Sequence, residues 1–282
     1  MTKTTGSFFL AAALLFSCSS NDQTTAESTS ATAPDSMATA PAIREEAVIL
    51  EAGTARLNSF VYSDSARTEK RPAVIVVPEW WGLNDYAKGR ARQLAGLGYT
   101  ALALDIYGGG QVAPDPGAAQ ALAMPFYSNP RLGADRIGAA IAYLGTRGEV
   151  DTARRGAMGY CFGGAMVLQA ARLGLPLQGV VSFHGDFPEE GWPKTSTAQV
   201  LVCHGAADAF VPMAKYESFL KKLDSAGVRH SGKVYDSATH AFTNPAATET
   251  ARRFNMPIRY NGAADTASWN DMKAFWRSVF GN

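Results

Sequence analysis

Short apolar runs alternate with helical patterns along most of the chain. The clearest run, AVIVV at residues 73–77, is continuous and β-branched, as in strands buried on both faces of a parallel sheet. Ile137, Ala140, Ile141 and Leu144 have the spacing of one helical face. This alternation predicts an α/β fold with a mainly parallel central sheet and helices on both faces. Further strands are expected at 100–104, 156–159, 179–183, 200–204 and 232–235, and further helices at 213–226 and 266–280.

An antiparallel hairpin at a sheet edge is expected from Ala47, where apolar residues recur on both sides of a turn at Gly53. No repeat or linker divides the chain beyond this point, so residues 47–282 are predicted to form one domain. Two segments, 108–130 and 243–262, are long for loops of a compact domain and are expected to cover a site.

The N-terminus is typical of a targeting segment. Lys3 lies in a short polar start, and the apolar stretch that follows is too short to span a bilayer. LFSC at residues 15–18 resembles the lipobox of bacterial lipoproteins, in which the cysteine is lipidated. We expect a signal peptide at 1–17, a lipidated Cys18, a disordered tether at 18–46 and an exported, membrane-anchored domain on the periplasmic or cell-surface side. A secretory signal cleaved elsewhere, or an uncleaved anchor, would also export the domain.

The charge balance indicates no nucleic-acid partner, because 26 Lys and Arg nearly equal 25 Asp and Glu. Three cysteines cannot form a disulfide framework, and Cys203, inside an apolar strand pattern, is expected in the core. The sequence has no glycine-rich phosphate loop and no spaced set of metal ligands, so no cofactor and no metal are expected. Nothing in it indicates an oligomeric state.

The most informative stretch is GAMGYCFGG at residues 156–164, where a short strand runs into a helix through Gly159-x-Cys161-x-Gly163. This is the nucleophile-elbow pattern with cysteine in place of serine. Glycines there allow two backbones to approach closely. The helix N-terminus favours a thiolate, and the N–H of Phe162 can serve an oxyanion hole. The alternative is a small buried cysteine that packs a glycine-rich turn.

The acid and the base follow the nucleophile along the chain in this pattern, with the histidine last. Asp208 comes directly after a strand and is the first candidate for the acid, although it could merely cap the turn before Val211; Asp186 is the second. Two of the four histidines precede Asp208. Of the others, His230 is expected on the solvated surface, and His240 lies in a loop after a strand, where a general base is presented.

Four motifs together resemble the dienelactone hydrolase family, from about Pro72 to the C-terminus. The resemblance implies an α/β-hydrolase that cleaves an ester or lactone through a cysteine acyl-enzyme, with Asp208 orienting His240 and His240 moving the proton. It also implies that Glu79 helps to activate the thiol and that the N–H of Trp80 is the second oxyanion donor. The motifs are PEWWGLN at 78–84, GYCFGG at 159–164, HGAAD at 204–208 and HAF at 240–242.

The chain departs from the family at the substrate. Members of the family hold the carboxylate of dienelactone with two arginines, whose places here are near Gly109 and Asn244, and neither residue is basic. We therefore expect a small-molecule ester or lactone other than dienelactone. Arg131, Arg253 or Arg259 could replace the missing arginines from a loop. Two other functions remain open, a non-catalytic ligand-binding lipoprotein and a thiol acyltransferase or peptidase.

Overall fold

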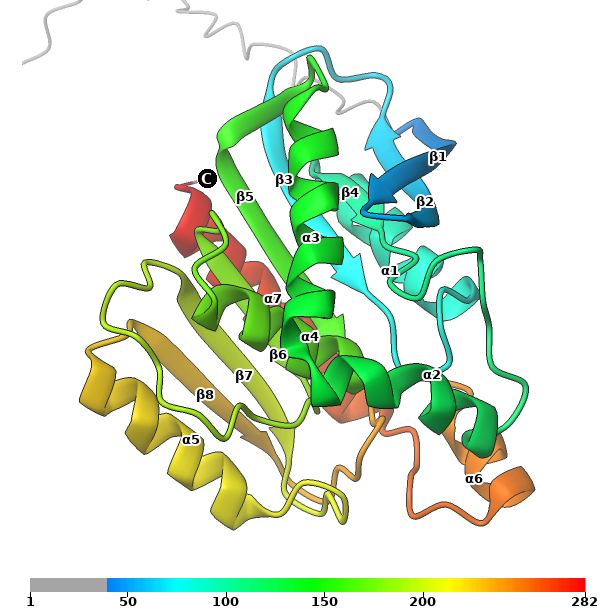
Figure 1. Ribbon diagram of the computed structural model, residues 1–282, viewed down its shortest axis with the longest axis vertical. Coiled ribbons are helices and arrows are strands. Elements are labelled where there is room, and N and C mark those ends of the chain that lie inside the picture. The colour runs from blue at the N-terminus through cyan, green and yellow to red at the C-terminus, as the bar shows by residue number, and fades with distance from the viewer. Residues whose placement is uncertain (1–39, 282) are drawn as a thin grey trace, which may run out of the picture. The chain divides into compact units, whose positions relative to one another are not determined.

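The computed structural model describes residues 40–281 of the chain. An eight-stranded sheet lies at its centre, with strand order β1-β2-β4-β3-β5-β6-β7-β8 (Figure 1). All neighbouring strands from β4 to β8 in this order are parallel, whereas β1 and β2 pair antiparallel with each other and β2 pairs antiparallel with β4. The prediction of a mainly parallel sheet is confirmed. The strands are β1 (Ile43–Ala52), β2 (Ala55–Asp64), β3 (Arg71–Val77), β4 (Thr100–Ala103), β5 (Val150–Tyr160), β6 (Gly179–Phe183), β7 (Gln199–Gly205) and β8 (His230–Tyr235).

Helices cover both faces of the sheet, as the sequence predicts. Side chains of the fully buried β3 alternate between two cores: Ile75 belongs to the core that includes residues of α3, α4 and α5 on one face, and Val76 belongs to the core that includes residues of α1 and α7 on the other. Burial on both faces explains why this strand is a continuous apolar run. The helices are α1 (Asp85–Gly96), α2 (Pro116–Ser128), α3 (Pro130–Gly145), α4 (Phe162–Arg172), α5 (Met213–Ala226), α6 (Ala247–Phe254) and α7 (Gly262–Phe280).

The hairpin of β1 and β2 forms one edge of the sheet, as expected, but it begins earlier than Ala47. Its pairing continues to Ile43 opposite Asp64, and the Asp64 carboxylate accepts a hydrogen bond of 3.0 Å from the N–H of Ala42. These long-range contacts extend the ordered strand into the end of the segment expected as a tether. The remainder of that segment, together with Cys18 and the expected signal peptide, lies outside the described residues.

Both segments expected as covering loops contain a helix. In the first, the side chain of Asp115 caps α2 by accepting a hydrogen bond of 2.9 Å from the N–H of Ala118, and Pro116 takes the first helical position. The second segment contains α6. Both helices lie near the end of the sheet to which β3 points (Figure 1). Within residues 40–281, no helix combines the length and the apolar character needed to cross a membrane.

Candidate active site

Cys161 lies at the sharp turn between β5 and α4, with a strained backbone (φ 51°, ψ −118°). The turn depends on its two glycines. A Cβ atom on Gly159 would lie 2.2 Å from the carbonyl of Gly163, and one on Gly163 would lie 2.3 Å from the carbonyl oxygen of Val77. The backbones therefore pass too close for any side chain, as the nucleophile-elbow pattern predicts.

The two residues expected to supply oxyanion N–H groups, Phe162 and Trp80, follow neighbouring strands of the sheet. Phe162 is the first residue of α4, where helical N–H groups have no partner within the helix. Trp80 follows β3, the strand paired with β5, and its carbonyl accepts a hydrogen bond of 2.9 Å from the Tyr107 hydroxyl.

His240 and Asp208 are joined by a hydrogen bond of 2.8 Å between Nδ1 and Oδ2. The other carboxylate oxygen, Oδ1, accepts the N–H groups of Phe210 and Val211, each at 2.9 Å. Asp208 thus caps its turn and also contacts the histidine. The arrangement fixes the imidazole ring and leaves its Nε2 as the nitrogen that can exchange a proton with another group.

The electrostatics of this pair favour a charged histidine. Burial alone would lower the pKa of His240, but the charge of the Cys161 thiolate and the hydrogen bonds to Asp208 and Cys161 raise it well above its ordinary value. Burial would likewise raise the pKa of Asp208, but its hydrogen bond with His240 and the neighbouring N–H groups lower it. The surroundings of His240 therefore favour its protonated, imidazolium form.

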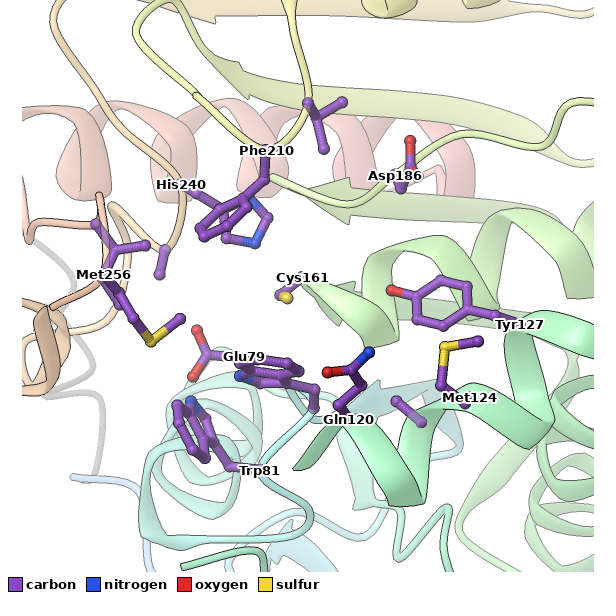
Figure 2. A pocket seen from close by; sticks show the side chains of 15 residues that line it. Glu79, Trp81, Gln120, Met124, Tyr127, Cys161, Asp186, Phe210, His240 and Met256 are labelled. Atoms are coloured by element: carbon purple, nitrogen blue, oxygen red, sulfur yellow. The ribbon is translucent and has the colours of Figure 1, made fainter. Parts of the chain in front are cut away.

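Glu79 occupies the turn after β3 and is buried, with 3% of its surface exposed. Burial raises the pKa of its carboxyl group to about 7, although a hydrogen bond of 2.7 Å from the Asn244 amide opposes this shift. Glu79 lines the same pocket as Cys161 and His240 (Figure 2). A carboxyl group that titrates near neutral pH can take up or release a proton during a reaction.

The other candidates lie in different settings. Asp186 lines the pocket but pairs with Lys215 at 3.2 Å, whereas the acid bonded to His240 is Asp208. His230 begins β8 and is half-buried, with Nδ1 2.9 Å from the carbonyl oxygen of Val228, because the strand extends further toward the helix than expected. Cys203 is fully buried in β7, as predicted.

His184, which no sequence motif singled out, contacts Cys161. Its Nδ1 accepts a hydrogen bond of 3.1 Å from the N–H of Cys161, so its proton is on Nε2, which lies 2.8 Å from the Thr243 hydroxyl. Burial and the charge of His240 hold the pKa of His184 well below its ordinary value. The one available signal was its position at the end of β6, the strand beside β5.

The pocket beside Cys161 has a volume of about 270 Å³. In Figure 2, His240 and Glu79 lie on one side of Cys161, and Tyr127 and Met124 of α2 lie on the other. The two segments expected to cover a site do contribute walls. They supply Gln120, Ala123, Met124, Tyr127, Met256 and Ile258.

The arginines that could replace the missing pair are not among the lining residues of this pocket in the described chain. Arg131 lies in the first turn of α3 and is exposed; Arg259 is also exposed. Arg253 lies over the ring of Phe254, with its guanidinium carbon 4.8 Å from the centroid. Across residues 40–281, no group of three or more His, Cys, Asp or Glu side chains is arranged to hold a metal ion.

Comparison with known proteins places this geometry in a family. A protein of Bradyrhizobium sp named as a 2-oxo-3-(5-oxofuran-2-ylidene)propanoate lactonase is 30% identical over 222 residues, 74% of this chain and 85% of that protein. A protein of Methylorubrum extorquens named as a carboxymethylenebutenolidase is 30% identical over 184 residues, which is 61% of this chain. The chain spans 63% of the length of that protein, which is under two thirds.

A solved structure shares the fold. A dienelactone hydrolase-like promiscuous phosphotriesterase from metagenomic libraries has a TM-score of 0.80 and 33% identity, over 84% of this chain and 98% of that one. The predicted α/β-hydrolase fold is thus confirmed. A sequence model of the dienelactone hydrolase family matches residues 57–280, which is most of the chain. The chain belongs to the dienelactone hydrolase family, and it is a hydrolase.

Proposed function

We propose that the protein hydrolyses small esters or lactones through an acyl-enzyme on Cys161. The observation that carries this proposal is the hydrogen bond between His240 and Asp208 in the pocket that also holds the Cys161 thiol. An oriented imidazole beside a thiol at a helix N-terminus is the arrangement that activates a cysteine nucleophile.

The reaction proceeds in two halves. His240 takes the thiol proton, the sulfur forms a bond to the carbonyl carbon, and the N–H groups of Phe162 and Trp80 stabilise the oxyanion. The C–O bond then breaks, and His240 returns the proton to the leaving alcohol. In the second half, His240 removes a proton from water, whose oxygen attacks the thioester, and the carboxylic acid leaves as the thiol is restored.

Glu79 assists the first proton transfer in this proposal. The family resemblance implies that role, and a buried carboxyl group with a pKa of about 7 is suited to it. Two other functions share the same pocket. A binding lipoprotein would not need the oriented His240, and an acyltransferase or peptidase would differ in the acceptor or in the bond cleaved.

The test is turnover of p-nitrophenyl esters and small lactones by the full chain and its Cys161→Ala variant. Cys203→Ala is the matched control, because that thiol is fully buried in β7. We expect activity in the wild type and the control and its loss in Cys161→Ala. Mass spectrometry of the quenched wild type should find the acyl group on Cys161. Full turnover by Cys161→Ala, or no turnover by the wild type, would overturn the proposal.

We also propose that the chain is exported and tethered to a membrane through a lipid on Cys18. This rests on the resemblance of residues 15–18 to a lipobox and on the lack of large apolar residues in most of the following segment. The hydrolase domain would then act outside the cytoplasm on substrates that reach the membrane surface.

A further inference from the structure

The pocket beside Cys161 is lined by acidic side chains and by no basic side chain other than His240 among the described residues. Among the described residues, the lining of the pocket contains the carboxyl groups of Glu79 and Asp186 but no lysine or arginine. Lys215, which pairs with Asp186, is not part of the lining. The positive charge that His240 can carry is already matched by Asp208, to which it is hydrogen-bonded. Asp186 is matched by Lys215 in the same way, so a bound anion would face the carboxyl group of Glu79 without an unpaired cation in the lining.

Asn244 adds no charge at this site. Its Nδ2 donates to Glu79 at 2.7 Å, and its Oδ1 accepts the N–H of Ala246 at 3.0 Å. The amide is thus held in one orientation by contacts inside the protein. It supports the Glu79 carboxyl group and does not provide the paired donors that a carboxylate ligand needs.

The walls of the pocket are apolar and largely aromatic. Trp81 stacks on Phe254 with 6.0 Å between ring centroids, and the Phe210 ring meets His240 edge-on at 5.2 Å. At the pocket, Met124 is 47% exposed, Tyr127 43% and Phe210 47%. Large apolar side chains gathered around one opening are typical of a surface that a ligand covers.

The size of the cavity limits what it can hold. Its volume of about 270 Å³ lies near the lower end of ligand pockets, which span roughly 300–1,000 Å³. One aromatic ring or a short alkyl chain with its ester group fits such a space. Larger leaving groups would extend past the exposed rim.

We infer that the substrate is an uncharged ester or lactone with an apolar or aromatic acyl group, and that the pocket rejects acyl groups carrying a carboxylate. This inference rests on the proposed function. Its physical reason is the cost of removing a carboxylate from water into an apolar pocket that contains the carboxyl group of Glu79 and no unpaired counter-ion. The same contacts favour a ring or alkyl chain, which gains from leaving water.

The experiment compares matched pairs of esters that differ in one charge. The aromatic pair is p-nitrophenyl benzoate and mono-p-nitrophenyl terephthalate; the aliphatic pair is p-nitrophenyl hexanoate and mono-p-nitrophenyl adipate. We expect kcat/KM of the full chain to be at least about 100-fold higher for the neutral member of each pair, after correction for spontaneous hydrolysis. Equal values, or a preference for the anionic esters, would overturn the inference.

A charge placed in the lining provides a second measurement. Gln120 of α2 lines the pocket, so Gln120→Arg would add a cation and Gln120→Met is its uncharged control. We expect the ratio of anionic to neutral turnover to rise about tenfold in Gln120→Arg relative to Gln120→Met. An unchanged ratio would contradict the charge argument.

The outcomes separate this inference from the proposed function. Hydrolysis that depends on Cys161 but favours the anionic esters removes only the inference about the substrate. If Cys161→Ala still hydrolyses the esters, or if the wild type hydrolyses none of the four, both the proposed function and the inference are overturned.

Discussion

The side-chain amide of Asn244 donates a hydrogen bond of 2.7 Å to the buried carboxyl group of Glu79. An amide can bond to either protonation state of a carboxyl group, whereas a cation would strongly favour the ionised state. Burial therefore dominates, and the pKa of Glu79 rises to about 7. The neutral residue at position 244 thus makes the charge of Glu79 dependent on pH in the neutral range.

Glu79→Gln should lower kcat/KM by about 100-fold, because the transfer of the Cys161 proton to His240 loses the carboxylate that assists it, and acid–base groups typically contribute 10²–10⁴-fold. Glu79 assists in this way only when ionised, so wild-type kcat/KM should rise as pH increases through about 7. This rise should be absent from the variant. The measurement is a pH profile from about 5 to 9; an identical profile in both proteins would contradict the role of Glu79.

The same carboxyl group should make stability depend on pH. Its folded pKa of about 7 lies above the ordinary glutamate value of 4.5, so the folded state binds the proton more tightly. This contribution to stability is present below pH 4.5 and is lost as pH rises to about 7. Denaturant unfolding at several pH values should show that the free energy of unfolding of the wild type falls over this range. In Glu79→Gln, the part of this fall that Glu79 causes should be absent.

Asp208→Asn should reduce kcat by about 10³- to 10⁴-fold, because the imidazole loses the acceptor that fixes its tautomer. Asp186→Asn is the matched control, since that carboxylate also lines the pocket but pairs with Lys215. Steady-state kinetics with a neutral aryl ester measure both. A larger loss in Asp186→Asn would reassign the acid.

His184→Phe should slow both turnover and alkylation of Cys161 by iodoacetamide by about tenfold. The N–H of the strained Cys161 loses one of its two acceptors and keeps only the Phe183 carbonyl, at 2.9 Å. KM should change less than kcat. His204→Phe is the control, because His204 is equally buried but stacks on Tyr216, with 5.1 Å between ring centroids. Unaltered alkylation in His184→Phe would limit His184 to a packing role.

Gly163→Ala should destabilise the protein by about 2 kcal/mol or more, because its Cβ would lie 2.3 Å from the Val77 carbonyl oxygen. Gly138→Ala in α3 should stabilise it by up to about 1 kcal/mol, because nothing lies within 4 Å of the added Cβ. Denaturant unfolding measures both. Equal effects of the two substitutions would contradict the close approach at the elbow.

Cys18→Ala should move the protein from the membrane fraction to the soluble fraction of cells, and mass spectrometry should find a lipid on Cys18 of the wild type only. Cys203→Ala should remain in the membrane fraction, since that cysteine is buried in β7. A wild-type protein found in the soluble fraction would contradict the anchor.

Features with a strong local pattern could be predicted from the sequence. The apolar run of β3 predicts a strand buried on both faces, and the glycines around Cys161 predict a turn where two backbones approach closely. The sheet and the elbow could therefore be predicted from these residues alone. Helix α2 was missed because its segment is rich in Gly, Ala and Pro, although Asp115 and Pro116 form a good helix start. The first half of β5 was missed because its side chains are mostly polar and partly exposed.

Contacts between distant parts of the chain could not be predicted in the same way. Glu79 and Asn244 are 165 residues apart, and His184 and Thr243 are 59 apart. Each pair meets only because the strands preceding these residues end at the same edge of the sheet. Their hydrogen bonds, and the pKa shifts that depend on burial, follow from the folded arrangement and have no local signature.

Helix α2 supplies one wall of the pocket, whereas Cys161, Asp208 and His240 lie in turns that follow β5, β7 and β8. Substitutions in α2 can therefore reshape the wall without moving Cys161, Asp208 or His240. Natural variation or directed evolution confined to residues 116–128 would be able to change which substrates the hydrolase accepts while the turns that hold these three residues stay constant.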